Sequence, residues 1–259
     1  EDSIRQIPTN RRASSSGRKY SKNTVTQNTQ KRQKQADGYW STLIPRKNVI
    51  AVVQKNFSWR HYMRKKSHIS LARDIVRNSE DEGLRKHKWA FYLGSILPDI
   101  KPSFLYKKHE IDGTFEQVKK EVRELSDSHG KYREHATKYY RDLGQITHYI
   151  ADYFTFPHNR TYPGNLKDHC SYEEVLKLRL REYLKTDKKD RWPFVQCHFG
   201  SAEALCDFIK LRHEEYLRRK IDVEEDIRHI VSLNYQVVEG IRQLAEQGKL
   251  HQYLSKKRA

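Results

Sequence analysis

The sequence of 259 residues has few cysteines and no long apolar run. Its three cysteines are too few for a disulfide framework and odd in number, so we expect free thiols in a reducing compartment. The longest candidate run, VIAVV at 49–53, falls far short of the roughly 18 apolar residues that span a membrane. The start of the chain also lacks the basic, apolar and small-residue order of a secretion signal. These absences predict a cytoplasmic protein with no transmembrane segment, and secretion stays the alternative if the N-terminus is not native.

Several catalytic signatures are missing as well. No His-Asp dipeptide occurs, which argues against the helical phosphohydrolases that are named for that pair. No His-Glu-x-x-His occurs, so the zinc-protease helix is absent. Neither a glycine-rich phosphate loop nor a serine elbow is present. The chemistry must therefore come from another arrangement of residues.

Positive charge is abundant and unevenly distributed. The formal net charge is +18, and residues 1–62 carry 13 Lys/Arg against 3 Asp/Glu, a net of +10. A basic protein attracts nucleic acid, anionic membranes or phosphate esters, and charge alone does not choose among them.

The first part of the chain differs in composition from the rest. Residues 1–48 are rich in Ser, Thr, Asn, Gln, Lys and Arg, and such a segment buries too little apolar surface to offset its ordering entropy. Met63, the single methionine, opens the first helical pattern. We therefore divide the chain into a disordered basic tail at 1–62 and a helical domain at 63–259. The tail is either a nucleic-acid-binding arm or an extension that is not native, and its composition favours the second interpretation.

Apolar residues recur at helical spacing through most of the domain, and no alternating strand pattern competes. Thr114 is the expected N-cap of one helix, with Gln117 completing a capping box, and Ser201 is the expected N-cap of another. Pro98 ends a helix that spans 80–97. The sequence predicts an all-α bundle of about six to eight helices with a metal site in its core. The candidate helices cover 67–76, 80–97, 113–125, 137–156, 169–184, 202–219 and the residues from 222 onward.

Histidines and carboxylates cluster between residues 148 and 173. Asp152 follows His148 by four residues, and Glu173 follows His169 by four, so each pair lies on one helix face. His158 lies in the loop between the two helices. Zinc binds neutral imidazole and carboxylate at about 2.0–2.2 Å, so each pair supplies half of a tetrahedral shell.

A buried hydrogen bond between His148 and Asp152 would explain the first pair equally well. The neighbours Ile146, Ile150 and Tyr153 are typical of a core, where a carboxylate needs a partner. The whole cluster favours a metal, because buried carboxylates are rare unless they are paired or metal-bound.

In order and spacing, these motifs resemble the zinc-dependent phospholipase C family, whose all-helical fold is shared with a group of nucleases. The resemblance spans about 63–245. It implies one zinc ion held by Asp99, His109, His148 and Asp152, and a second held by His158, His169 and Glu173. It also implies that Asp99 is the general base and that Tyr106 lies in the substrate pocket.

Two positions depart from the family pattern. His68 matches a histidine that binds a third zinc together with the shared Asp152. In secreted family members that ion also binds the amino group of an N-terminal tryptophan, whereas Trp59 lies inside this chain. We therefore expect two zinc ions, and a third would lack that ligand. Ile100 replaces a choline-binding aromatic residue, so a preference for phosphatidylcholine does not carry over.

The resemblance implies hydrolysis of a phosphodiester by a zinc-activated water. The implied partner is a phosphodiester, such as a phospholipid at a membrane surface. One alternative is a nuclease of the same fold, which the basic charge suits, although Glu173 and the short gap from His158 to His169 favour the phospholipase branch. The other alternative is a zinc-stabilised binding protein without catalytic activity.

Overall fold

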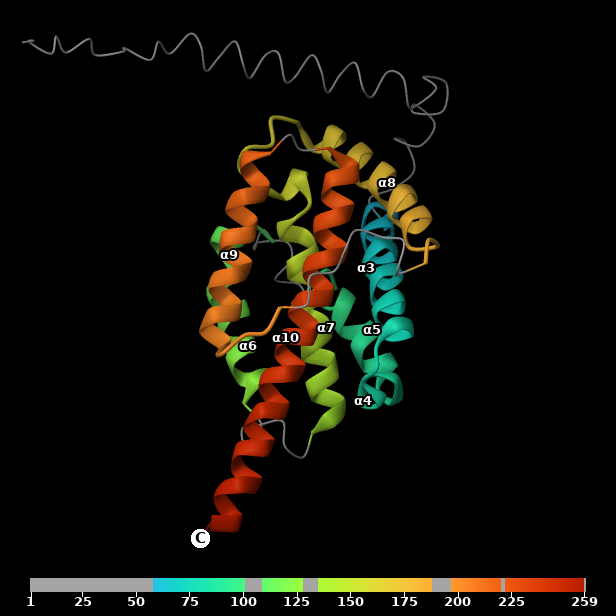
Figure 1. The fold of residues 1–259 in the computed structure, drawn as a ribbon. Coiled ribbons are helices and arrows are strands. Elements are labelled where there is room, and N and C mark those ends of the chain that lie inside the picture. The colour runs from blue at the N-terminus through green and yellow to red at the C-terminus, as the bar shows by residue number, and fades with distance from the viewer. Residues whose placement is uncertain (1–57, 101–108, 128–134, 188–196, 220–221, 259) are drawn as a thin grey trace, which may run out of the picture. The chain divides into compact units, whose positions relative to one another are not determined.

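The computed structural model describes residues 58–100, 109–127, 135–187, 197–219 and 222–258, with side chains from residue 66 to 248 (Figure 1). All of them belong to the second of two units, residues 51–259. The predicted boundary between residues 62 and 63 is not tested and stays a prediction, although helix α3 already begins at Ser58.

The described residues form eight α-helices and one short 3₁₀ helix, with no strand among them, which confirms the predicted all-α class. None of these helices combines the length and apolarity needed to cross a bilayer. The elements are α3 (Ser58–Asn78), α4 (Glu82–Lys86), α5 (Lys88–Ile96), α6 (Ile111–Ser126), α7 (Ala136–Tyr153), η2 (Phe156–His158), α8 (Leu166–Tyr183), α9 (Ala202–Arg218) and α10 (Val223–Arg258).

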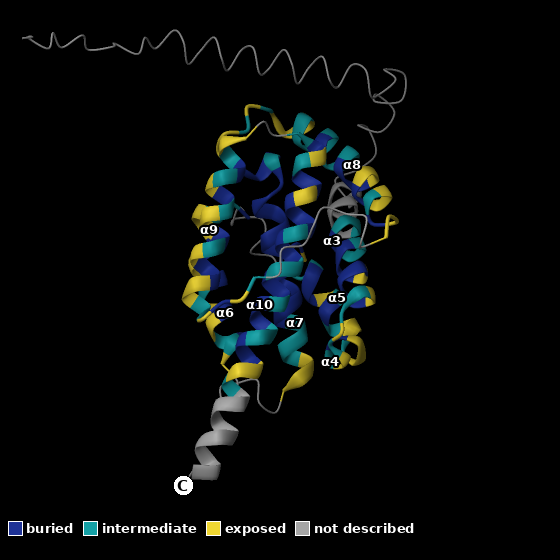
Figure 2. Ribbon diagram, viewed as in Figure 1, coloured by how far each residue is buried: buried dark blue, intermediate teal, exposed yellow. Residues whose placement is uncertain are grey.

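Helix α7 lies at the centre of the bundle, and every residue from 142 to 153 on it is buried (Figure 2). Helix α5 packs very closely against it. A Cβ atom at Gly94 would overlap the carbonyl oxygen of Arg141, and one at Gly144 would overlap that of Phe91. Glycine at both positions is therefore what lets α5 approach α7, and this approach places the end of α5 beside His148.

Helix α10 supplies the longest apolar face of the core. The apolar stripe expected from the sequence is buried throughout, from Val223 to Leu244. It packs against α6, α7, α8 and α9. The spacing of these residues is a local property of the sequence, which is why the prediction is confirmed.

Some helix ends differ from the sequence-based expectation. Helix α6 begins at Ile111, so Thr114 lies inside the first turn and is not the N-cap; its Oγ1 bonds to Glu110 O at 2.8 Å. The segment 80–97 is broken at His87 into α4 and α5. Ser201 caps α9 as predicted, because its side chain accepts a hydrogen bond from Ala204 N.

Helix α8 begins three residues earlier than predicted. The Asn165 side chain accepts hydrogen bonds from the backbone N–H groups of Lys167 and Asp168. The Asp168 carboxylate accepts in return from Asn165 N, which completes a capping box. This cap fixes the first turn of α8, which carries His169.

Candidate metal centre

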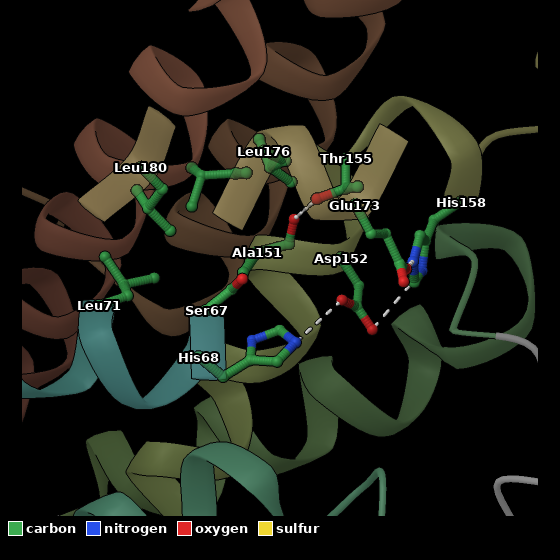
Figure 3. A pocket seen from close by; sticks show the side chains of 11 residues that line it. Ser67, His68, Leu71, Ala151, Asp152, Thr155, His158, Glu173, Leu176 and Leu180 are labelled. Carbon is green, nitrogen blue, oxygen red and sulfur yellow. Dashed lines mark hydrogen bonds and ion pairs between the residues drawn. The ribbon is translucent and has the colours of Figure 1, made fainter. Parts of the chain in front are cut away.

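The eight predicted ligands converge where α3, α5, α7, η2 and α8 meet. Within this part of the chain they form three groups, and the ligand atoms of each group lie within 4.8 Å of one another. Two of the groups share His148 on α7, and Figure 3 shows four of the eight side chains around a cavity. The first group is Asp99 with His109 and His148, the second is His158 with His169 and Glu173, and the third is His68 with His148 and Asp152.

The first group is fully buried and comes from three separate segments. His148 Nε2 lies 3.1 Å from His109 Nδ1 and 3.7 Å from Asp99 Oδ1, and the latter two atoms are 3.8 Å apart. The other ring nitrogen of His148 donates a hydrogen bond to Ser95 O at 2.9 Å. This bond fixes the tautomer, so Nε2 is the ligand atom that His148 presents.

Asp152 connects the groups. Its Oδ2 lies 2.9 Å from His109 Nδ1, 3.2 Å from His148 Nε2 and 3.6 Å from His158 Nδ1. Its Oδ1 lies 3.4 Å from His68 Nε2. A single carboxylate thus faces four imidazoles, an arrangement that suits a bridging role between cations.

The second group lies nearer the surface. Glu173 Oε1 lies 2.8 Å from His169 Nε2 and 3.2 Å from His158 Nε2. His158 is buried, whereas His169 and Glu173 are partly exposed. This group therefore forms the side of the centre through which solvent has access.

The pKa values on α7 and α3 follow from burial and from these neighbours. Burial alone lowers the pKa of His148, but the charges of Asp152 and Asp99 outweigh it and raise the value to about 9. Burial alone raises the pKa of Asp152, but the charges of His158 and His148 hold it well below its usual value. Burial, with the charge on His148, lowers the pKa of His68. These shifts favour an anionic Asp152 with a protonated His148 beside it.

The donor set fits a divalent metal such as zinc. Two ligands of a tetrahedral zinc at about 2.0–2.1 Å lie about 3.3 Å apart, close to the separations measured here. Asp99 Oδ2 is buried and has no hydrogen-bond partner among the described residues. An orphaned carboxylate oxygen in the core is costly, and a bound cation would remove that cost.

A cavity of about 30 Å³ adjoins His68, Asp152, His158 and Glu173 (Figure 3). This volume holds on the order of two water molecules. Its far wall is apolar and includes Leu71, Leu176 and Leu180. The cavity therefore offers room for a water nucleophile directly beside the ligands.

The sequence analysis missed a buried carboxylate behind the second group. Asp226 on α10 accepts hydrogen bonds from Tyr172 OH at 2.8 Å, Tyr216 OH at 2.7 Å and Phe156 N at 2.8 Å. Burial raises its pKa to about 7. It ties together η2 and α8, which carry His158 and Glu173. The sequence signal that could have identified Asp226 is an aspartate within the apolar stripe of α10. Tyr106, the predicted substrate-pocket residue, lies outside the described residues.

A comparison with protein-family models matches residues 67–222 to the zinc dependent phospholipase C family. The match covers more than half of the chain and contains all eight predicted ligands. The chain belongs to the zinc-dependent phospholipase C family, as its motifs suggested. Searches among curated proteins and among solved structures found no match.

Proposed function

We propose that this protein is a zinc-dependent phospholipase C that hydrolyses the phosphodiester bond of a phospholipid. One observation carries the proposal: two separate sets of imidazole and carboxylate donors lie close together, and the buried set includes a carboxylate oxygen that has no hydrogen-bond partner among the described residues. A purely structural hydrogen-bond network would be expected to satisfy that oxygen.

The two ions would be held by different residues. The first would take Asp99, His109 and His148, with Asp152 beside them, and the second would take His158, His169 and Glu173. Because His148 Nδ1 is bonded to Ser95, His148 has one nitrogen to offer and serves the first ion. A third ion at His68 would then find only that histidine and Asp152 in this group, so the proposed stoichiometry is two.

When bound, zinc supplies Lewis-acid polarisation of the phosphoryl oxygens and activation of a water molecule. Asp99 Oδ2 is the proposed base and accepts the proton of the attacking water. The bond from the water oxygen to phosphorus forms as the bond to the glycerol oxygen breaks, and the proton on Asp99 is then available to the departing alkoxide. The Asp152 carboxylate lies between His109 and His158 and holds both imidazoles in position.

Ile100, the exposed residue directly after the proposed base Asp99, bears on which head group the substrate carries. Ile100 offers no π face to a quaternary ammonium group. We therefore propose a phospholipid substrate without a requirement for choline.

The test combines zinc content with hydrolysis of a substrate panel. Full-length protein is assayed on phosphatidylcholine, phosphatidylethanolamine, phosphatidylserine, a chromogenic phosphodiester, and single-stranded DNA and RNA, with and without chelator. We expect zinc-dependent release of phosphorylated head group from lipid. Asp207 on α9 is exposed, so Asp207→Asn is the matched control for Asp99→Asn. Bound zinc without turnover of any ester would refute the enzyme and leave a metal-stabilised binding protein, and faster cleavage of nucleic acid would indicate a nuclease.

A further inference from the structure

Exposed apolar side chains are concentrated on one segment of the protein. Six large apolar side chains are exposed within the described residues, and three of them lie between residues 89 and 100. Trp89 is 71% exposed, Leu93 is 48% exposed and Ile100 is 47% exposed. Trp89 and Leu93 are four residues apart on α5, so they share one face, and Ile100 is exposed in the turn after α5, next to Asp99.

The packing of the opposite face of α5 explains why Trp89 and Leu93 point into solvent. Phe91, Gly94 and Ser95 are buried against α7, so the close packing of the two helices fixes the rotation of α5. The exposed residues of α4 and α5 are drawn yellow in Figure 2. An exposed apolar patch on a rigid element of this kind marks an interaction surface.

The same segment is basic. Residues 83–98 contain Arg85, Lys86 and Lys88 and no acidic residue, and all three cations are exposed. Lys88 Nζ lies 5.8 Å from the centre of the Trp89 ring. Lys86 and Lys88 have no ion-pair partner in the described part of the chain. Tryptophan and leucine flanked by lysine is the composition of surfaces that lie in the interface of an anionic bilayer.

A hollow of about 780 Å³ adjoins this face, between α5 and the start of α7. Trp89 and Leu93 line one side, and Lys138 and Arg141 line the other. Both of these cations also contact Asp142, which is buried beneath them. The hollow therefore combines an apolar wall with cationic groups, as the region of a lipid phosphate and its glycerol requires.

We propose that the exposed surface formed by Trp89, Leu93 and Lys88 on α5, with Lys86 at the end of α4 and Ile100 in the turn after α5, docks the protein onto an anionic phospholipid bilayer. The choice of partner rests on the proposed function, and the surface itself does not. Nucleic acid would engage the lysines but would leave the apolar series in water, so a lipid surface accounts for both features. Docking on this surface places the bilayer along α5, whose last residue, Ile96, lies three residues before Asp99.

The test measures vesicle binding separately from catalysis. Full-length protein is sedimented with vesicles of phosphatidylcholine alone and with vesicles of equal parts phosphatidylcholine and phosphatidylserine, at low and high salt. Wild type should bind the mixed vesicles more strongly, and less so at high salt. Trp89→Ala should weaken partitioning by about tenfold or more, since a large apolar side chain no longer leaves water. Lys86→Glu with Lys88→Glu should abolish the preference for phosphatidylserine.

Leu211 on α9 is 53% exposed, so Leu211→Ala is the matched control and should bind as wild type does. All variants should hydrolyse a soluble chromogenic phosphodiester at the wild-type rate, because none of these residues belongs to the metal centre. Equal vesicle binding by wild type and Trp89→Ala overturns the surface assignment, whatever the catalytic result. A dimer that Trp89→Ala dissociates, or DNA binding that it alone abolishes, also overturns it. Normal vesicle binding without hydrolysis would refute only the proposed function.

Discussion

Tyr172→Phe tests whether Asp226 holds the second ligand group in place. The Tyr172 hydroxyl is buried and donates to Asp226 Oδ2 at 2.8 Å. A hydrogen bond to a charged group stabilises by about 1.5–3 kcal/mol, and one to a neutral group by about 0.5–1.5 kcal/mol. The loss of free energy of unfolding should therefore depend on whether Asp226 is ionised.

The sign follows from the pKa of Asp226. Burial raises it to about 7 from an ordinary value of 3.8, although hydrogen bonds from Phe156, Tyr216 and Tyr172 act in the opposite direction. The folded state holds this proton more tightly than the unfolded state, so the contribution of Asp226 to stability falls as pH rises from about 4 to about 7. Removing the Tyr172 hydroxyl raises the pKa further. In the variant, the free energy of unfolding therefore continues to fall at higher pH, so its difference from wild type increases above pH 7.

Urea unfolding at about pH 6 and about pH 8.5 measures this difference on both sides of the pKa. We expect a loss of about 0.5–1.5 kcal/mol at the lower pH and about 1.5–3 kcal/mol at the higher pH. The higher value corresponds to a melting temperature lower by about 3–12 °C for a domain of this size. Chelator competition should also show weaker zinc binding, because Asp226 anchors Phe156 N, two residues before His158.

Tyr162 provides the control. It is half-buried near the same group, and its hydroxyl makes no hydrogen bond to another described residue. Tyr162→Phe should therefore change stability little and equally at both pH values. An identical loss for Tyr172→Phe at the two pH values would show that Asp226 does not change its charge there, and the reasoning would be wrong.

Three further changes probe the centre. Asp152→Asn should lose zinc and about 3–5 kcal/mol of stability by elemental analysis and urea unfolding, because the surrounding imidazoles lose their anion; retained zinc would contradict this. Asp99→Asn should keep more of the fold while hydrolysis falls by about 10²–10⁴, and equal zinc loss in both variants would leave Asp99 as a ligand only. Gly144→Ala should lower the free energy of unfolding by about 1–3 kcal/mol and weaken zinc binding, because the added methyl group moves α5 away from α7. Gly200→Ala is the control and should be neutral, since Gly200 faces open space. Equal melting temperatures for the two variants would refute the close-packing argument.

The local features of this protein were readable from its sequence. The apolar stripe of α10 and the pairs His148 with Asp152 and His169 with Glu173 depend on helical periodicity, which a few neighbouring residues determine. The N-cap at Ser201 is equally local. The start of α8 was not predicted although its cap is local, because Asn and Asp side chains such as Asn165 and Asp168 also form local backbone hydrogen bonds in turns outside helices.

Other features depended on how distant segments pack. His68, Asp99 and His109 matched a family pattern, but their spacing in sequence could not bring them to His148. For Asp99, that placement follows from the close approach of Gly94 to Arg141 and of Gly144 to Phe91, which sets the separation of α5 and α7. The partners of Asp226 come from η2, α8 and α9, so its role was invisible in sequence. The outward direction of Trp89 likewise follows from which face of α5 the glycine contact buries, since periodicity gives the faces of a helix and only packing decides which of them meets water.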